Sequence, residues 1–162
     1  MSAESVTAYF KADHDRLDEL FARFQRLKRT DFPLAAEAFK AFQAGLRRHI
    51  IWEEELLFPL FERKTGMTSG PTQVMRMEHR QIGRDLDAIH GKVEAQQANT
   101  VAEEQSLQGV LSRHNFKEEK ILYPAIDQAL QDNDRASLFD AMSRIPEPAH
   151  ATHTREGGPS GG

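Results

Sequence analysis

Large apolar side chains recur every three or four residues in four long segments of this chain. That spacing aligns them along one side of an α-helix, which indicates amphipathic helices that pack against one another. No stretch of useful length alternates with a period of two, so strands are not expected. The four series of regularly spaced positions are Phe10, His14, Leu17, Phe21 and Phe24; Phe42, Leu46, His49, Glu53, Leu56 and Leu60; Met75, His79, Ile82, Leu86, Ile89 and Val93; and Leu107, Leu111, His114, Glu118, Ile121 and Ala125.

Turn-forming residues separate these segments and set the expected topology. The breaks lie at residues 30–33, 66–71, 99–100 and 132–134. Short connections between four long helices favour an all-α, up-down-up-down four-helix bundle. Pro59 and Pro124 fall inside predicted helices, and each is expected to end or kink its helix locally.

The C-terminal part is expected to hold a short fifth helix followed by a disordered tail. Asp134 is a residue type that caps helix N-termini, so this helix is predicted from Asp134 to Ile145. Residues 146–162 contain almost no large apolar side chain, which predicts disorder. The sequence therefore predicts one domain over residues 1–145.

Six polar side chains occupy positions in the four series where a plain core would have an apolar residue. They are His14, His49, Glu53, His79, His114 and Glu118. A glutamate buried on such a seam is costly unless it is paired or bound to a metal. In the second and fourth series the histidine and glutamate are four residues apart, which places both on one helix face, one turn apart.

The chain reads as two copies of a helical hairpin. The signature H-x-x-x-E-E-x-[LI]-L-[FY]-P begins at His49 and again 65 residues later at His114. The lone histidines of the first and third segments, His14 and His79, are also 65 residues apart. Two such copies would pack about a pseudo-two-fold axis, and each would bring one lone histidine and one His-x-x-x-Glu pair to the centre.

Four imidazoles and two carboxylates that meet inside a bundle predict a binuclear metal site. Carboxylates can bridge two cations and reduce their repulsion, and neutral imidazoles suit iron, zinc, copper or nickel. The chain has no cysteine, which argues against copper(I), structural zinc, iron–sulfur clusters and thiol chemistry. A buried structural polar network is the alternative explanation of the six residues.

These residues also match a known family. The order H…H-x-x-x-E…H…H-x-x-x-E, with its flanking signatures, resembles the hemerythrin-like (HHE cation-binding) domains from Tyr9 to Ile126. The resemblance implies a four-helix bundle around a centre of two non-haem iron ions. The implied arrangement has two histidines on each iron and two bridging glutamates, namely His14 with His49, His79 with His114, and Glu53 with Glu118.

One position departs from the family pattern. Many members have a second histidine four residues after that of the third helix, but here this position is Gly83. A solvent ligand could fill the vacancy, another side chain could replace the missing one, or the site could be weaker and partly occupied. Asp18 holds the equivalent position in the first copy and is a candidate ligand, with a surface or capping role as the alternative. Glu54 and Glu119 are expected on the helix surface or behind the ligands.

Composition narrows the class of protein and its compartment. The 162 residues fit one domain, and 25 acidic against 21 basic residues give a net charge of -4, whereas nucleic-acid binders usually have a basic excess. No apolar run approaches membrane-spanning length, and the first twenty residues lack the apolar stretch of a secretory signal. We therefore expect a cytoplasmic protein with no nucleic-acid or membrane partner, and the sequence does not predict its oligomeric state.

The first functional hypothesis is binding or sensing of dioxygen, or a related small ligand, at the di-iron centre. The resemblance implies chemistry with dioxygen, nitric oxide or peroxide, whereas the residue spacing indicates only the metal site. The alternatives are a di-iron enzyme that detoxifies peroxide or nitric oxide, and an iron-responsive sensor or iron donor. Relatives that repair iron–sulfur clusters carry a cysteine-bearing extra domain, which disfavours a repair role for this cysteine-free chain.

Overall fold

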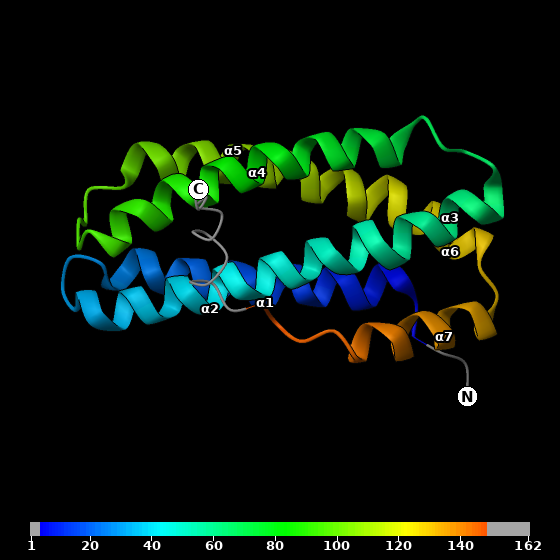
Figure 1. The fold of residues 1–162 in the computed structure, drawn as a ribbon, viewed down its shortest axis with the longest axis horizontal. Coiled ribbons are helices and arrows are strands. Elements are labelled where there is room, and N and C mark those ends of the chain that lie inside the picture. Colours follow the sequence, from blue (N-terminus) through cyan, green and yellow to red (C-terminus); the bar gives the residue numbers. More distant parts are fainter. Residues whose placement is uncertain (1–3, 149–162) are drawn as a thin grey trace, which may run out of the picture.

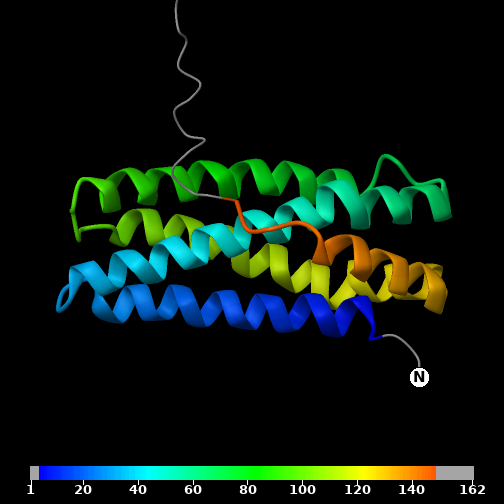
Figure 2. The same ribbon diagram turned by 60° about the horizontal axis from the view of Figure 1, so that its bottom comes forward.

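The structure is a computed structural model that describes residues 4–148, and it is all-helical over that range. This confirms the predicted all-α class. Four helical arms lie side by side along the long axis, and successive arms run in opposite directions (Figures 1 and 2). The arms are α1 (Val6–Leu27); α2 (Phe32–Ile51), which continues through the π-helical turn η1 (Trp52–Leu57) into α3 (Phe58–Thr65); α4 (Pro71–Glu94); and α5 (Val101–Lys117), which continues through the π-helical turn η2 (Glu118–Leu122) into α6 (Tyr123–Ala129).

A fifth helix, α7 (Asp132–Ser143), lies alongside the arms near α3 and α6 (Figure 1). The Trp52 indole donates a hydrogen bond to the carbonyl of Met142 at 3.1 Å, which ties α7 to η1. The helix begins two residues before the predicted start, because Gln131 is the N-cap and Asp134 completes a capping box from the first turn. The predicted disorder of the tail falls mostly on residues 149–162, which lie outside the described residues.

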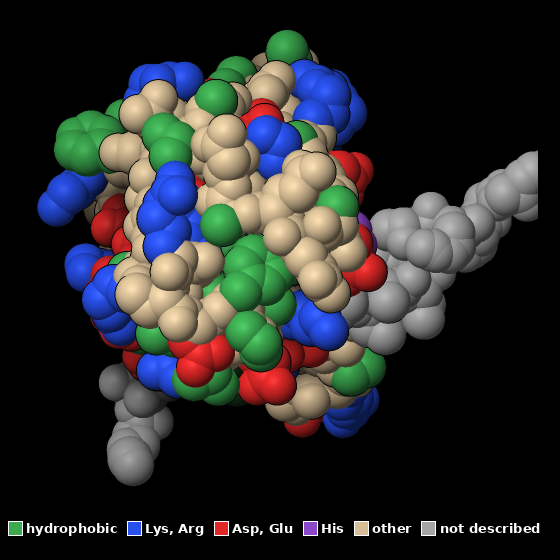
Figure 3. Space-filling model, turned by 90° about the vertical axis from the view of Figure 1, so that its left-hand side faces the viewer, with side chains coloured by type: hydrophobic (Ala, Val, Ile, Leu, Met, Phe, Trp, Pro, Cys, Tyr) green, Lys and Arg blue, Asp and Glu red, His purple; other side chains and the backbone are tan. Residues whose placement is uncertain are grey.

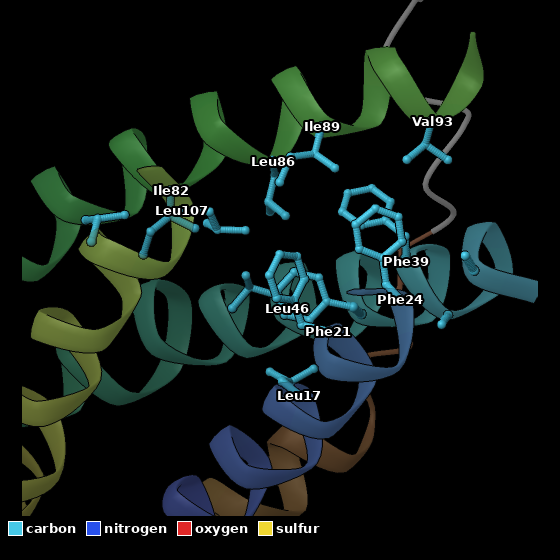
Figure 4. Close-up of a cluster of buried hydrophobic side chains, with 14 residues drawn as sticks. Leu17, Phe21, Phe24, Phe39, Leu46, Ile82, Leu86, Ile89, Val93 and Leu107 are labelled. Atoms are coloured by element: carbon cyan, nitrogen blue, oxygen red, sulfur yellow. The ribbon is translucent and has the colours of Figure 1, made fainter. Parts of the chain in front are cut away.

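The core consists of two apolar clusters with a polar layer between them. The cluster shown in Figure 4 draws side chains from α1, α2, α4 and α5, among them Phe21, Phe39 and Ile89. The other cluster surrounds Phe10 and Trp52 near α7. On every arm the predicted site histidine lies between members of the two clusters. The apolar side chains therefore seal this layer from both sides.

The two π-helical turns change which side chains face the core. Each accommodates one extra residue per turn relative to an α-helix, so the buried face moves forward by one position. Leu57 is buried where Leu56 was expected, and Leu122 is buried where Ile121 was expected. The predicted series is therefore wrong after each glutamate, and Ile121 is 62% exposed.

The prolines of the repeated signature explain the position of both π-helical turns. Proline has no N–H group, and its ring clashes with the carbonyl four residues earlier in an α-helix. In both arms the residue before the proline instead donates to a carbonyl five residues back, from Phe58 to Glu53 and from Tyr123 to Glu118. The expected end or kink of each helix is thus replaced by a local widening, after which α3 and α6 continue with proline in their first turn.

Polar contacts fasten the arms at both ends. The carboxylate of Asp127 on α6 accepts hydrogen bonds from the backbone of Val6 and Thr7 and so caps α1. At the opposite end, which faces the viewer in Figure 3, the buried Lys28 ammonium donates to Glu104. Thr100 donates to the same carboxylate at 2.5 Å. No helix within residues 4–148 is long and apolar enough to cross a membrane.

We predict that Glu104→Gln lowers the free energy of unfolding by about 3–5 kcal/mol, because it leaves the Lys28 ammonium buried without its counter-charge. The matched control is Glu103→Gln. Glu103 pairs with Lys92 at 3.0 Å on the partly exposed side of the same helix turn, and such pairs contribute at most about 1 kcal/mol. Urea unfolding of the two variants measures the difference, and equal losses would contradict the assignment.

Candidate metal centre

The structure brings all six predicted site residues into the polar layer between the two clusters. Each is at least 95% buried, and both glutamates have no exposed surface. Their ligand atoms form two groups, and within each group all of these atoms lie within 4.8 Å of one another. One group contains His14 and His49, the other contains His79 and His114, and both contain Glu53 and Glu118.

Each glutamate lies between the two histidine pairs. The Nε2 atoms of His49 and His79 lie 3.3 and 2.9 Å from the two oxygens of Glu53. The Nε2 atoms of His14 and His114 lie 3.2 and 3.1 Å from the two oxygens of Glu118. Each carboxylate therefore faces one histidine of either pair, which is the placement that a bridging ligand requires.

In each hairpin, one acidic residue orients a histidine of the same hairpin. The residue before the lone histidine bonds to the Nδ1 atom of the histidine on the neighbouring arm. Asp13 on α1 lies 2.9 Å from His49, and Glu78 on α4 lies 2.8 Å from His114. An Nδ1–H bonded to a carboxylate leaves Nε2 free to face the centre, and it holds the ring in one orientation.

Two further carboxylates complete this arrangement from the opposite hairpin. Glu54 lies 2.6 Å from Nδ1 of His79, and Glu119 lies 2.7 Å from Nδ1 of His14. Both positions follow a central glutamate in the repeated signature, and the structure places them behind histidines as the sequence allowed. All four imidazoles are therefore held by an acid at Nδ1, and the two hairpins hold each other's lone histidine.

Sequence reasoning missed Tyr123. Its hydroxyl group lies at the centre of the layer, where it can donate to either Glu53 or Glu118, the latter at 2.8 Å. It also lies 3.3 Å from Nε2 of His49 and 3.5 Å from that of His14. The [FY] position of the repeated signature could have drawn attention to this residue. In an uninterrupted α-helix, however, its side chain would point away from the core.

Tyr123 makes the two halves of the site unequal. Its counterpart in the first copy is Phe58, whose ring stacks on His79 with 5.9 Å between centroids. The half with His14 and His49 therefore has a phenol group beside it, and the other half has an apolar ring. Burial raises the pKa of Tyr123 well above its ordinary value, and Glu118 and Glu53 raise it further, so the phenol stays protonated.

Asp18, the candidate replacement ligand, and Gly83, the position of the missing histidine, both lie outside the two ligand groups. Asp18 is exposed and lines a surface groove between α1 and α5. Partial burial of the carboxyl group raises its pKa although the residue as a whole is exposed. The charges of Asp15 and Glu119 add to that rise, and His14 opposes it. Gly83 is half-buried, and a Cβ added there would meet no heavy atom within 4 Å. Among residues 4–148, no other histidine, aspartate or glutamate joins the two ligand groups.

The buried carboxylates of the polar layer favour positive charge on the groups around them, as the pKa shifts show. Burial alone would lower the pKa of His49, but Glu53 and Asp13 outweigh it and raise the pKa to about 10. In the same way Glu53 and Glu54 raise the pKa of His79 to about 9, against the effect of burial. Burial would raise the pKa of Glu53, yet the neighbouring His49 and His79 lower it well below its usual range. Protons on the histidines supply the counter-charge that cations would otherwise supply.

The donor set fits metal cations. Four Nε2 atoms and two buried carboxylates face one small cavity with room for about one water-sized molecule. Oε2 of Glu118 accepts no well-formed hydrogen bond among the described residues, although Nε2 of His114 lies 3.1 Å from it. A buried carboxylate oxygen in that position could bind a metal ion. Imidazole and carboxylate together suit iron, manganese or zinc better than magnesium or copper(I).

We predict that the metal-free protein loses stability as the pH rises from about 6.5 to about 10. The folded pKa values of His49 and His79 lie above the ordinary value of 6.5. Their protonation therefore stabilises the fold fully below about pH 6.5, and this contribution disappears as the pH passes the folded values. Urea unfolding at a series of pH values measures the slope. His49→Gln should flatten the decline, and a stability independent of pH in this range would rule out the proposed charge state.

Comparison with known proteins points to a family. The chain is 34% identical over 92 residues to the iron-sulfur cluster repair protein YtfE of Yersinia pseudotuberculosis serotype O:1b (strain IP 31758), and 35% identical over 91 residues to that of Edwardsiella ictaluri (strain 93-146). It is 30% identical over 91 residues to a probable iron-sulfur cluster repair protein of Haemophilus influenzae. Each match covers 52% of this chain and 41% of the relative, so the chain matches less than half the length of these relatives.

No solved structure matches the chain significantly. The model of the hemerythrin HHE cation-binding domain matches residues 5–126, a range that contains α1 to α5, both π-helical turns and all six residues of the two ligand groups. The chain therefore belongs to the hemerythrin HHE cation-binding domain family.

Proposed function

We propose that the protein folds as an up-down-up-down four-helix bundle of the hemerythrin type and holds two non-haem iron ions. In this proposal His14 and His49 bind one ion, His79 and His114 bind the other, and Glu53 and Glu118 bridge them. The support is the pair of overlapping ligand groups that share both glutamates. Family membership adds that the domain is a cation-binding one.

We further propose that the iron pair removes peroxide. A pair of iron ions supplies the electron exchange by which two molecules of hydrogen peroxide become two of water and one of dioxygen. The observation that carries this proposal is the protonated Tyr123 hydroxyl among the metal-facing atoms. A buried phenol can give a proton to a departing oxygen and take it back, which is the work of a general acid.

Other residues in and around the polar layer would hold the ligands in place and keep bulk water out. The outer carboxylates of Asp13, Glu54, Glu78 and Glu119 hold the four imidazoles in place. The apolar clusters on both sides exclude bulk water, and the small cavity limits the reactant to a molecule of a few atoms. Preorganised ligands in a dry site require little rearrangement during reaction.

A second candidate function is a part in iron–sulfur cluster repair, because the curated relatives carry that name. Both candidate functions agree better with the names of the relatives than does reversible dioxygen binding, the first hypothesis from the sequence. Incubation of the iron-loaded protein with a cluster-free apoprotein separates them. Iron transfer to that apoprotein supports repair, whereas peroxide turnover without iron loss supports detoxification.

We predict two iron ions per chain, one for each ligand group, and at least about tenfold weaker iron binding in Glu53→Gln. The substitution removes the charge that both groups share. Glu55→Gln is the matched control, because Glu55 is exposed two residues further along the same turn. Metal analysis after purification and iron titration of the metal-free protein provide the measurement. Equal iron binding by both variants would refute Glu53 as a ligand.

We predict that Tyr123→Phe keeps its iron but disproportionates peroxide about a hundredfold more slowly, the lower range for the loss of a general acid. Tyr9→Phe changes the only other tyrosine, which stacks on Phe139 away from the ligands, and it should retain the full rate. Oxygen evolution from hydrogen peroxide gives the rates. An undiminished rate in iron-loaded Tyr123→Phe would exclude the phenol as the acid.

A further inference from the structure

A groove of about 580 Å³ lies on the surface between α1 and α5. Two of its lining residues, Leu111 and Asn115, also line the small cavity at the metal centre. These two side chains on α5 therefore form the wall that separates the surface groove from the buried cavity. We call them the shared wall. The groove is thus a surface hollow that shares residues with the metal-facing cavity.

The duplicated architecture supplies an internal comparison for this groove. A shift of 65 residues carries α1 onto α4 and α5 onto α2, so each groove position has a counterpart on the opposite face. The groove residues Ala22 and Ser112 correspond to Asp87 and Arg47. On the opposite face these two larger residues form an ion pair with 3.0 Å between Asp87 Oδ1 and Arg47 Nη2, which spans the space that Ala22 and Ser112 leave open.

The shared wall also differs between the two faces. Leu46 is the counterpart of Leu111, and Ile50 is the counterpart of Asn115; all four line the central cavity. The α2–α4 face therefore has two apolar side chains at the wall, and the groove face has one apolar side chain and one amide. An amide can donate and accept hydrogen bonds, so the wall on the groove face offers a small molecule a polar contact that Leu46 and Ile50 do not offer.

The charge of the groove restricts what enters it. Three carboxylates line it, from Asp15, Asp18 and Glu119, and none of its lining residues is a lysine, arginine or histidine. Asp15 pairs with Lys11 and Glu119 with His14, which leaves Asp18 as the unbalanced charge among them. A concave surface lined by one sign of charge repels ions of that sign.

We propose that uncharged small molecules, hydrogen peroxide in the first place, reach the metal centre through the α1–α5 groove between Leu111 and Asn115, and that the acidic wall excludes anions. This inference rests on the proposed function for the identity of the reactant. The route itself depends only on the shared wall and on the difference between the two faces.

The first experiment measures the route without metal. Dissolved dioxygen is uncharged and paramagnetic, so it speeds the relaxation of the methyl protons that it approaches. In the metal-free full chain we expect the Leu111 methyl groups to relax faster under oxygen pressure than those of Leu46, their counterparts on the opposite face. Ser112→Phe, which fills the groove from an exposed position, should abolish the difference. Equal relaxation of Leu111 and Leu46 in the unmodified protein would overturn the route.

The second experiment uses the iron-loaded protein. Ser112→Phe and Asn115→Leu should both slow the second-order reaction with hydrogen peroxide, and Arg113→Phe, an exposed neighbour that does not line the groove, should not. Asp18→Lys should speed the binding of azide, an anion, about tenfold at low salt, and added salt should reduce this gain. Unchanged rates in Ser112→Phe and Asn115→Leu at full iron content would overturn the proposal.

The two experiments separate the route from the function. A chain that binds no iron would refute the proposed function, yet the methyl relaxation would still decide the route. A chain that binds iron and turns over peroxide, with equal relaxation on both faces, would keep the function and refute the groove.

Discussion

The burial of two carboxylates in the middle of an apolar core is the constraint on which the rest of the structure depends. Glu53 and Glu118 have no exposed surface, and a carboxylate in such surroundings is tolerated only with compensating positive charge. Four imidazoles face the two carboxylates, and four further acids hold the imidazoles. The polar residues of each arm are therefore paired only when the four arms pack in the correct register.

The π-helical turns reconcile this polar layer with the apolar clusters on either side. One extra residue in each turn moves the buried face forward, which brings Leu57 and Leu122 into the core and Tyr123 to the centre. The widened turn also lets consecutive glutamates, such as Glu53 and Glu54, contact the same histidine from two sides. A π-helical turn is less favourable than an α-helical one, and such turns are frequent at functional sites.

The duplicated hairpin makes the two halves of the molecule similar, and a few substitutions between the copies make the two halves chemically different. Tyr123 opposes Phe58, so one half of the polar layer has a proton donor and the other an apolar ring. The Arg47–Asp87 ion pair spans one face of the bundle, whereas small side chains leave a groove on the other. The two ligand groups contain the same residue types, yet they differ in what surrounds them.

The sequence by itself determined the helical class, the two hairpin copies and the six residues that converge, because helical spacing and a 65-residue repeat place side chains on faces without knowledge of the partners. It could not determine the register beyond Glu53 and Glu118, because a proline is compatible with a kink, an end or a widened turn. The central position of the Tyr123 hydroxyl group and the pairing of Glu54 with His79 were therefore visible only in the tertiary structure. Contacts between hairpins depend on how the arms pack, and that packing is decided by the whole core at once.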